Sequence, residues 1–292
     1  MYKQIEENKR KTIIIIVCFV IMIGAIAALF AWAYNDPWIA VWTVIVATIY
    51  AVIQYYASSS LAMVMTGAKE IAKKDNPRFY NIVENLSITT GLPMPKVYII
   101  DEQAPNAFAT GRDPEHAAVA ATTGLIDIMD DKELTAVMAH EMSHVKNYDI
   151  RVSMIVFGLV CVVGLISDLA FRMMFYGNRR RDNEGSPVGY VLVLIAAVLS
   201  PLVASLAQMA VSRQREFLAD ASAVNITRYP EGMISALKKL QAHSQPMKSQ
   251  NIATEAMYIN NPLKKGFFSN LFSSHPPIEK RIERLEHGKT NF

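Results

Sequence analysis

Four long apolar runs constrain the fold of this chain more than any other sequence feature. They cover residues 13–34, 38–56, 152–171 and 188–211, and they contain 22, 19, 20 and 24 residues. An α-helix needs about 20 apolar residues to cross the roughly 30 Å hydrocarbon core of a bilayer. The only charged residue in the four runs is Asp168. The runs therefore predict a multi-pass membrane protein and exclude a purely soluble one.

The first two runs predict a helical hairpin. The first run is longer than the apolar core of a signal peptide, which is about 7–15 residues, and no small-residue cleavage site follows it. Asn35-Asp36-Pro37 is typical of a tight turn. Lys and Arg residues precede the first run and follow the second, whereas the turn has none. The positive-inside rule then places the N-terminus and the residues after Tyr56 in the cytoplasm.

The last two runs leave two alternatives open. Arg179, Arg180 and Arg181 lie between them, and a spanning hairpin would place this basic loop outside, against the positive-inside rule. The charge-free fourth run favours spanning. The alternative is that both runs pack on the soluble part. Asp168 lies four residues before Arg172, which indicates an ion pair near the interface rather than an intramembrane functional group.

The composition also argues against a disulfide framework, a cysteine metal site and nucleic-acid binding. Cys18 and Cys161 both lie inside apolar runs, so neither a disulfide framework nor a cysteine metal site is expected. The net charge is only +3, and no basic stripe with interleaved aromatic residues is present. Nucleic acid is therefore not an expected partner.

The chain divides into four segments. These are a transmembrane hairpin (1–56), the first part of a catalytic domain (57–151), a second hydrophobic hairpin (152–211) and the second part of the catalytic domain (212–292). Residue patterns predict strands at about 96–100, 106–111 and 117–121, and helices at about 76–86, 131–147, 212–225, 230–243 and 277–287. Residues 244–274 predict a long loop. We expect the two catalytic parts to fold together.

The segment His140-Glu141-Met142-Ser143-His144 lies inside the predicted helix over 131–147. Positions i and i+4 share one face of an α-helix, so both imidazoles can bind one zinc ion. Glu141 lies beside that ion and can take a proton from water that the metal activates. The pattern is rare by chance, because the chain has only 6 His among 292 residues. The alternative is a pair of core or solvated histidines.

A catalytic zinc ion needs a third protein ligand and an open position. The metzincin pattern needs a His six residues after His144, and Ile150 occupies that position. The remaining pattern takes a Glu from a second helix, which favours Glu216. Asp220 shares its face and can accept a hydrogen bond from the far nitrogen of a ligating histidine. A solvated face with Arg–Glu pairs is the alternative for this helix.

These motifs resemble those of the HtpX family of bacterial membrane metalloproteases, which are related to CAAX prenyl endoproteases. The likeness covers nearly the whole chain, including the first hairpin, both ligand segments, residues 105–111, and residues 274–277 with Arg281. It implies a mostly helical membrane protein with transmembrane helices and a cytoplasmic α+β zincin-like domain of gluzincin type with a small sheet. It also implies one zinc ion per subunit and endopeptidase activity.

The resemblance further implies a multi-pass protein of the bacterial cell membrane, with the catalytic site on the cytoplasmic side. Its expected substrates are misfolded or damaged proteins, mainly membrane proteins, in quality control under stress, and self-cleavage is implied as well. Two segments match the family less specifically. Asn106, Ala107 and Phe108 resemble an edge strand that pairs with substrate, and an ordinary strand is the alternative. His275 and Arg281 resemble a segment near the active site that stabilises the oxyanion, and helix capping with surface pairing is the alternative.

The predicted mechanism has His140, His144 and Glu216 hold zinc while Glu141 acts as general base and then as general acid. An intramembrane protease is excluded, because the predicted helix over 131–147 carries too many charges to span a bilayer. The remaining alternative is a non-proteolytic membrane scaffold or transporter with a structural zinc. Structural sites usually close with four protein ligands, and no fourth ligand is evident.

Overall fold

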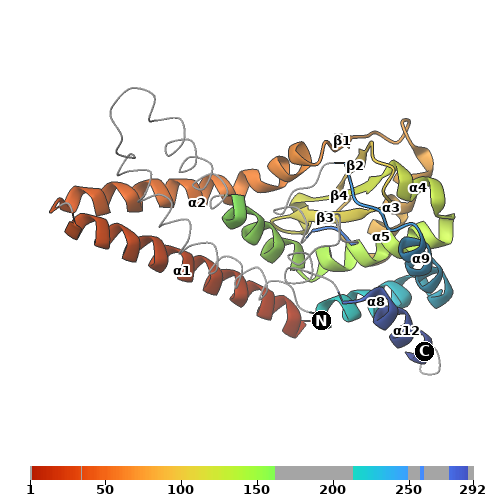
Figure 1. Cartoon of the computed structure of the whole chain (residues 1–292). Helices are drawn as coiled ribbons and strands as arrows, with labels where there is room; N and C mark the ends of the chain where they lie inside the picture. Colours follow the sequence, from red (N-terminus) through yellow and green to blue (C-terminus); the bar gives the residue numbers. More distant parts are fainter. Residues whose placement is uncertain (1, 34, 162–212, 249–256, 260–275, 289–292) are drawn as a thin grey trace, which may run out of the picture.

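Two long helices at the N-terminus form a hairpin that extends away from the rest of the chain in this computed structural model (Figure 1). Helix α1 spans Tyr2–Ala33 and helix α2 spans Pro37–Met65. The Asp36 side chain accepts a hydrogen bond from the backbone N–H of Trp38, and Pro37 lies in the first turn of α2. A proline there loses no helical hydrogen bond. The predicted turn between the first two apolar runs is therefore confirmed.

Helix α1 begins at Tyr2, well before the apolar run that starts at Ile13. Asn8 and Thr12 lie in this polar extension and are buried, with exposed fractions of 2% and 6%. Asn8 donates a hydrogen bond to the backbone carbonyl of Asn147, in the sheet-containing part of the chain. The extension is thus held by polar tertiary contacts, which apolar periodicity cannot reveal.

The structure describes residues 2–33, 35–161, 213–248, 257–259 and 276–288. The predicted second hairpin lies outside these ranges apart from residues 152–161, and so does most of the predicted loop over 244–274. Residues 149–161 are helical, and Val152, Val156 and Leu159 pack against Ile15 and Phe19 of α1.

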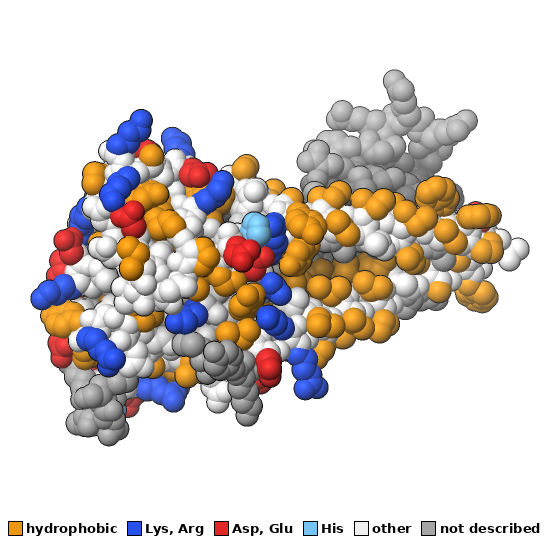
Figure 2. Space-filling view, turned by 180° about the vertical axis from the view of Figure 1, so that it is seen from behind, with side chains coloured by type: hydrophobic (Ala, Val, Ile, Leu, Met, Phe, Trp, Pro, Cys, Tyr) orange, Lys and Arg blue, Asp and Glu red, His pale blue; other side chains and the backbone are white. Residues whose placement is uncertain are grey.

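The outer surface of the hairpin is apolar. Figure 2 shows hydrophobic side chains along its length, whereas Lys, Arg, Asp and Glu gather over the sheet-containing part. Ile13, Trp42 and Val46 are each more than 60% exposed. Among the described residues, one helix segment, Val41–Met65, is both long and apolar enough to cross a membrane. A surface of this kind is expected where lipid replaces water.

Four short strands form one mixed sheet in the order β1-β2-β4-β3. They are β1 (Lys69–Glu70), β2 (Lys96–Ile100), β3 (Ala107–Gly111) and β4 (Ala117–Thr122). Strands β2 and β4 are parallel, with Tyr98 opposite Ala120, and the other two pairs are antiparallel. The three predicted strands are confirmed. Strand β1 is not predictable from the sequence, because two residues carry no periodicity.

The predicted helices are confirmed, with ends shifted by a few residues. They are α3 (Pro77–Thr90), α5 (Asp131–Lys146), α8 (Arg213–Thr227), α9 (Pro230–Ala242) and α12 (Ile278–Gly288). Two short elements are additional, the 3-10 helix η1 (Pro114–His116) and α4 (Thr123–Ile128). Helix α3 extends beyond its predicted end at residue 86 and reaches Thr90. Gly91 then ends it, with a left-handed φ of 68°.

Helix α5 lies at the centre of the core (Figure 1). It packs against β3 and against α3, α8 and α9. Leu134, Val137, Met138 and Met142 of this helix are each 0% exposed. Because other elements cover it on several sides, a polar side chain on a covered face of α5 is largely removed from water and needs a partner.

Candidate metal centre

The start of α5 is fixed by its own sequence. Asp130 accepts a hydrogen bond from the Glu133 backbone N–H at 2.8 Å, and Glu133 accepts one from the Asp130 backbone N–H at 2.8 Å. This reciprocal cap satisfies two donors that a helix start leaves unpaired. Lys239 of α9 pairs with the same Glu133 carboxylate at 2.6 Å. The cap therefore fixes both the register of α5 and its contact with α9.

His140, His144 and Glu216 bring three potential metal ligands together from α5 and α8. Nε2 of His140 lies 3.2 Å from Nε2 of His144 and 3.5 Å from Oε2 of Glu216. Nε2 of His144 lies 3.6 Å from Oε1 of Glu216. Zinc bonds of about 2.0–2.2 Å in a tetrahedron place ligand atoms about 3.3–3.6 Å apart. The three separations therefore fit a single zinc ion.

The far nitrogens of both histidines face carboxylates. Nδ1 of His140 lies 2.9 Å from Oδ1 of Asp220, and Nδ1 of His144 lies 2.9 Å from Oδ2 of Asp149. When each Nδ1–H donates to its carboxylate, each Nε2 presents a lone pair. Two lone pairs and the Glu216 carboxylate then converge on one point. This arrangement requires a cation at that point, either a proton or a metal ion.

The carboxylates determine the protonation of the metal-free centre. Burial disfavours a proton on His140, but hydrogen bonds to Asp220 and Glu216 outweigh it and raise the pKa from 6.5 to about 9. Burial also disfavours a proton on His144, yet Glu216 and Asp149 raise its pKa. A metal ion must therefore displace a proton near neutral pH, which makes the metal affinity fall as the pH falls.

Arg281 is a buried member of the centre, not a surface residue. It is 1% exposed, and it donates from Nε at 2.9 Å and from Nη2 at 2.6 Å to the two oxygens of Asp220. Burial opposes the charge of Asp220, but Arg281 and His140 lower its pKa to about 2. Asp220 thus stays ionised while it accepts a hydrogen bond from His140. The other predicted residue of this segment, His275, lies outside the described residues.

Glu141 lies beside His140 on α5 and is 3% exposed. Among the described residues, no side chain or backbone group forms a hydrogen bond with its carboxylate. The charge of this carboxylate helps to raise the pKa of the buried Arg281 of α12. Glu141 therefore lies beside a metal ligand, where a carboxylate can act on water.

Asp149 is the residue of the centre that sequence reasoning missed. It lies five residues after His144, past the end of α5, and it is 6% exposed. Burial opposes its charge, but hydrogen bonding to His144 and the charges of His144 and Arg215 lower its pKa. The only signal in the sequence is a carboxylate closely following the second His. Helical periodicity cannot relate Asp149 to His144, because α5 ends at Lys146.

The strand that contains Ala107 and Phe108 is an edge of the sheet, as predicted. Phe108 is 0% exposed and packs edge-on against Tyr258, and the Ala107 carbonyl accepts a hydrogen bond from the Ile259 backbone N–H at 2.9 Å. Asn106 is also buried and bonded to Thr122. The edge is therefore partly covered by residues 257–259, and its next outward-facing peptide groups belong to Ala109 and Gly111.

Comparison with known proteins decides which family has this arrangement. Residues 73–289 match the family described as Peptidase family M48. The chain belongs to peptidase family M48. It is 51% identical to a Protease HtpX homolog of Tropheryma whipplei (strain Twist), over 292 residues that cover both chains completely. Relatives with the same name occur in Streptococcus uberis (47% identical) and Ligilactobacillus salivarius (44%), each aligned over 98% of this chain and 99% of the relative.

Membership of the M48 family makes the chain a metalloprotease, and the resemblance to the HtpX family is confirmed. The crystal structure of S. mikatae Ste24p is similar in fold, with a TM-score of 0.53 and 19% identity over 98% of this chain and 67% of that one. The mostly helical M48 peptidase fold with a small sheet is thereby shown. The family implies a metal ion, and His140, His144 and Glu216 form a group that could hold it.

Proposed function

We propose that the chain is a membrane-embedded zinc endopeptidase whose metal is held by His140, His144 and Glu216. The observation that carries the proposal is the set of separations of 3.2, 3.5 and 3.6 Å among their ligand atoms. A bound zinc ion would lower the pKa of water and polarise the scissile carbonyl. Only three protein ligands converge among the described residues, which leaves room for water and substrate and argues against a closed structural site.

Glu141 is the proposed general base. Its carboxylate, next to His140, takes the proton from the attacking water and then delivers it to the leaving amine. Asp220 and Arg281 keep His140 oriented while this happens. The burial of these residues and the contacts of Asp220 with His140 and Arg281 support these roles.

Substrate binding is proposed along the edge strand β3, beside α5. Strand addition would give affinity through backbone hydrogen bonds with little demand on the substrate sequence. The peptide groups of Ala109 and Gly111, which face away from β4, support this role more directly than Ala107, whose carbonyl is already paired with Ile259. Asn106 and Phe108 would support the strand from the buried side. A low preference for substrate sequence is expected of a protease that degrades misfolded membrane and cytosolic proteins in quality control.

The proposed location is the bacterial cytoplasmic membrane, with the N-terminus and the metal centre on the cytoplasmic side. The apolar surface of the hairpin and the basic residues at its base support this orientation. A single cysteine placed in the loop over 177–187, in a variant whose Cys18 and Cys161 are replaced, tests the second hairpin. Labelling from outside intact cells supports a spanning hairpin, and labelling only after permeabilisation contradicts it.

The proposed activity is tested with the full-length chain purified in detergent. We expect about one zinc ion per chain, casein cleavage that a chelator abolishes, and recovery of cleavage when zinc is restored. A chain that retains bound zinc but never cleaves casein would favour the alternative of a scaffold or transporter with structural zinc. A chain that cleaves casein equally well after complete removal of metal would contradict the proposal.

A further inference from the structure

Asp149 faces back toward the metal centre although it follows the end of α5. Oδ2 of its side chain lies 2.9 Å from Nδ1 of His144. The turn that brings it there passes through Tyr148, whose φ of 61° lies in the left-handed region. A residue other than glycine adopts this conformation only where its surroundings hold it. Lys9 and Arg151 both lie over the Tyr148 ring, at 5.0 Å and 4.8 Å from its centroid.

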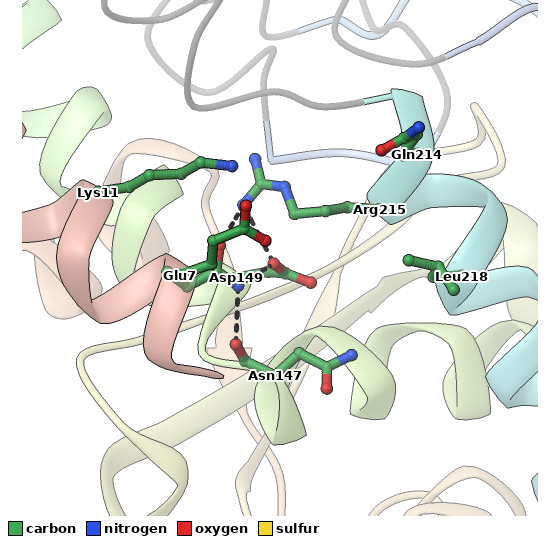
Figure 3. A pocket seen from close by; sticks show the side chains of 8 residues that line it. Glu7, Lys11, Asn147, Asp149, Gln214, Arg215 and Leu218 are labelled. Atoms are coloured by element: carbon green, nitrogen blue, oxygen red, sulfur yellow. Dashed lines mark hydrogen bonds and ion pairs between the residues drawn. The ribbon is translucent and has the colours of Figure 1, made fainter. Parts of the chain in front are cut away.

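The second oxygen of Asp149 is held by residues from two distant segments (Figure 3). Asn8 of α1 donates from Nδ2 to Oδ1 of Asp149 at 2.6 Å, and Arg215 of α8 donates from Nη1 to the same oxygen at 3.0 Å. Asn8 also donates to the backbone carbonyl of Asn147 at 2.8 Å. One asparagine side chain thus contacts both the carboxylate and the end of the helix that contains both histidines.

Asn8 is not part of the apolar surface of the hairpin. It precedes the apolar run of α1, it is 2% exposed, and a buried amide is costly unless its hydrogen bonds are satisfied. Its partners all belong to the cluster around Asp149, which lines a cavity of about 100 Å³ between α1, the end of α5 and α8 (Figure 3). The N-terminal helix therefore reaches the metal centre through one continuous chain of contacts, from Asn8 to Asp149 to His144.

We propose that Asp149 is the positioning residue for His144, and that Asn8 makes the N-terminal helix part of the metal centre by holding Asp149. The proposal rests on the proposed function, because it takes His144 to be a metal ligand. A carboxylate that accepts from Nδ1–H fixes the tautomer that turns Nε2 toward the metal and makes that nitrogen a stronger ligand. Asn8 and Arg215 restrain the carboxylate so that it cannot turn away. Helix α1 then contributes to metal affinity as well as to membrane attachment.

The test measures zinc affinity by chelator competition on the full-length chain in detergent. Loss of such a carboxylate typically weakens metal binding by about 10–100-fold, and we expect this for Asp149→Ala. We expect a smaller loss for Asp149→Asn, because the amide oxygen can still accept from Nδ1–H. Asn8→Ala should weaken zinc binding several-fold. Glu6→Ala, which changes an exposed residue of the same helix turn, serves as the matched control and should change nothing.

Two further readouts separate positioning from general destabilisation. The visible spectrum of the cobalt-substituted chain reports the ligand field, and it should shift in Asp149→Ala even at saturating cobalt. In the double variant Asn8→Ala with Asp149→Ala, zinc affinity should equal that of Asp149→Ala alone, because Asn8 acts through Asp149.

Wild-type zinc affinity and an unchanged cobalt spectrum in Asp149→Ala would overturn the positioning role. A full, additive loss from Asn8→Ala in the Asp149→Ala background would overturn the coupling to α1. If Asp149→Ala does not fold, Asp149→Asn and Asn8→Ala carry the test, and wild-type affinity in both overturns the proposal. A wild-type chain that binds no zinc would instead contradict the proposed function.

Discussion

Arg281 and Asp220 form a buried ion pair directly behind the first histidine of the metal centre. Nη2 of Arg281 lies 2.6 Å from Oδ1 of Asp220, and the two residues are each 1% exposed. That same oxygen lies 2.9 Å from Nδ1 of His140. Removal of one partner of a buried ion pair leaves an uncompensated charge, which is strongly destabilising. The orientation of His140 therefore depends on Arg281 of α12, which lies 141 residues later in the sequence.

Replacing Arg281 by Met should destabilise the metal-free chain by about 3–5 kcal/mol, because it leaves the buried Asp220 charge without a partner. Arg281→Lys should have an intermediate effect, since an ammonium cannot donate the two parallel hydrogen bonds of a guanidinium. Denaturant unfolding in detergent measures both. The double variant Arg281→Met with Asp220→Leu should recover stability without recovering zinc affinity. Unchanged stability of Arg281→Met would contradict the role given to this pair.

Stability should depend on pH through Glu133, which caps α5 and pairs with Lys239. Burial opposes its charge, but hydrogen bonds from Lys239, Ser235 and the Asp130 backbone lower its pKa below the ordinary 4.5. Its contribution is therefore fully present above pH 4.5 and is lost as the pH falls through the lowered pKa. Glu133→Gln should cost about 1–2 kcal/mol at neutral pH.

The difference between Glu133→Gln and wild type should shrink steadily in unfolding measurements below pH 4.5. Glu84→Gln is the control, because Glu84 pairs with Lys73 at 2.6 Å on an exposed surface, and exposed pairs contribute only about 0–1 kcal/mol. A cost of Glu133→Gln that stays constant from neutral to strongly acidic pH would show that its charge is not what stabilises the cap.

Glu216→Ala should lose most of the bound zinc, because two imidazoles alone form an incomplete site. Metal analysis after dialysis against a weak chelator measures the loss. Glu283→Ala, an exposed residue of α12, is the control and should retain zinc. Full zinc retention by Glu216→Ala would show that another residue supplies the third ligand.

Local spacing predicted the parts of the site that lie within helices. His140 and His144 are separated by one turn of α5, and Glu216 and Asp220 by one turn of α8, so each pair shares a face whatever the rest of the chain does. The pairing of the two helices followed from the chemistry of the metal, which needs a third ligand. The predicted strands and helices agree with the structure because their apolar periodicity also determines their burial.

The contacts made by irregular backbone were not predictable. Asp149 reaches His144 only because Tyr148 adopts a left-handed conformation, and nothing in its side chain favours that conformation. Asn8 and Arg281 are both buried polar residues whose partners lie more than 60 residues away in the sequence. From their residue types alone, Asn and Arg are expected to be exposed to solvent. Only the folded arrangement shows that they are buried and paired.

The most direct test of the proposed mechanism is Glu141→Gln, which keeps the shape of the side chain and removes its ability to take a proton. Zinc content and casein cleavage are measured in parallel on the full-length variant and on wild type. We expect the variant to bind zinc as wild type does and to lose cleavage, because Glu141 acts on water without holding the metal. Cleavage by Glu141→Gln at the wild-type rate would contradict the assignment of Glu141 as the base.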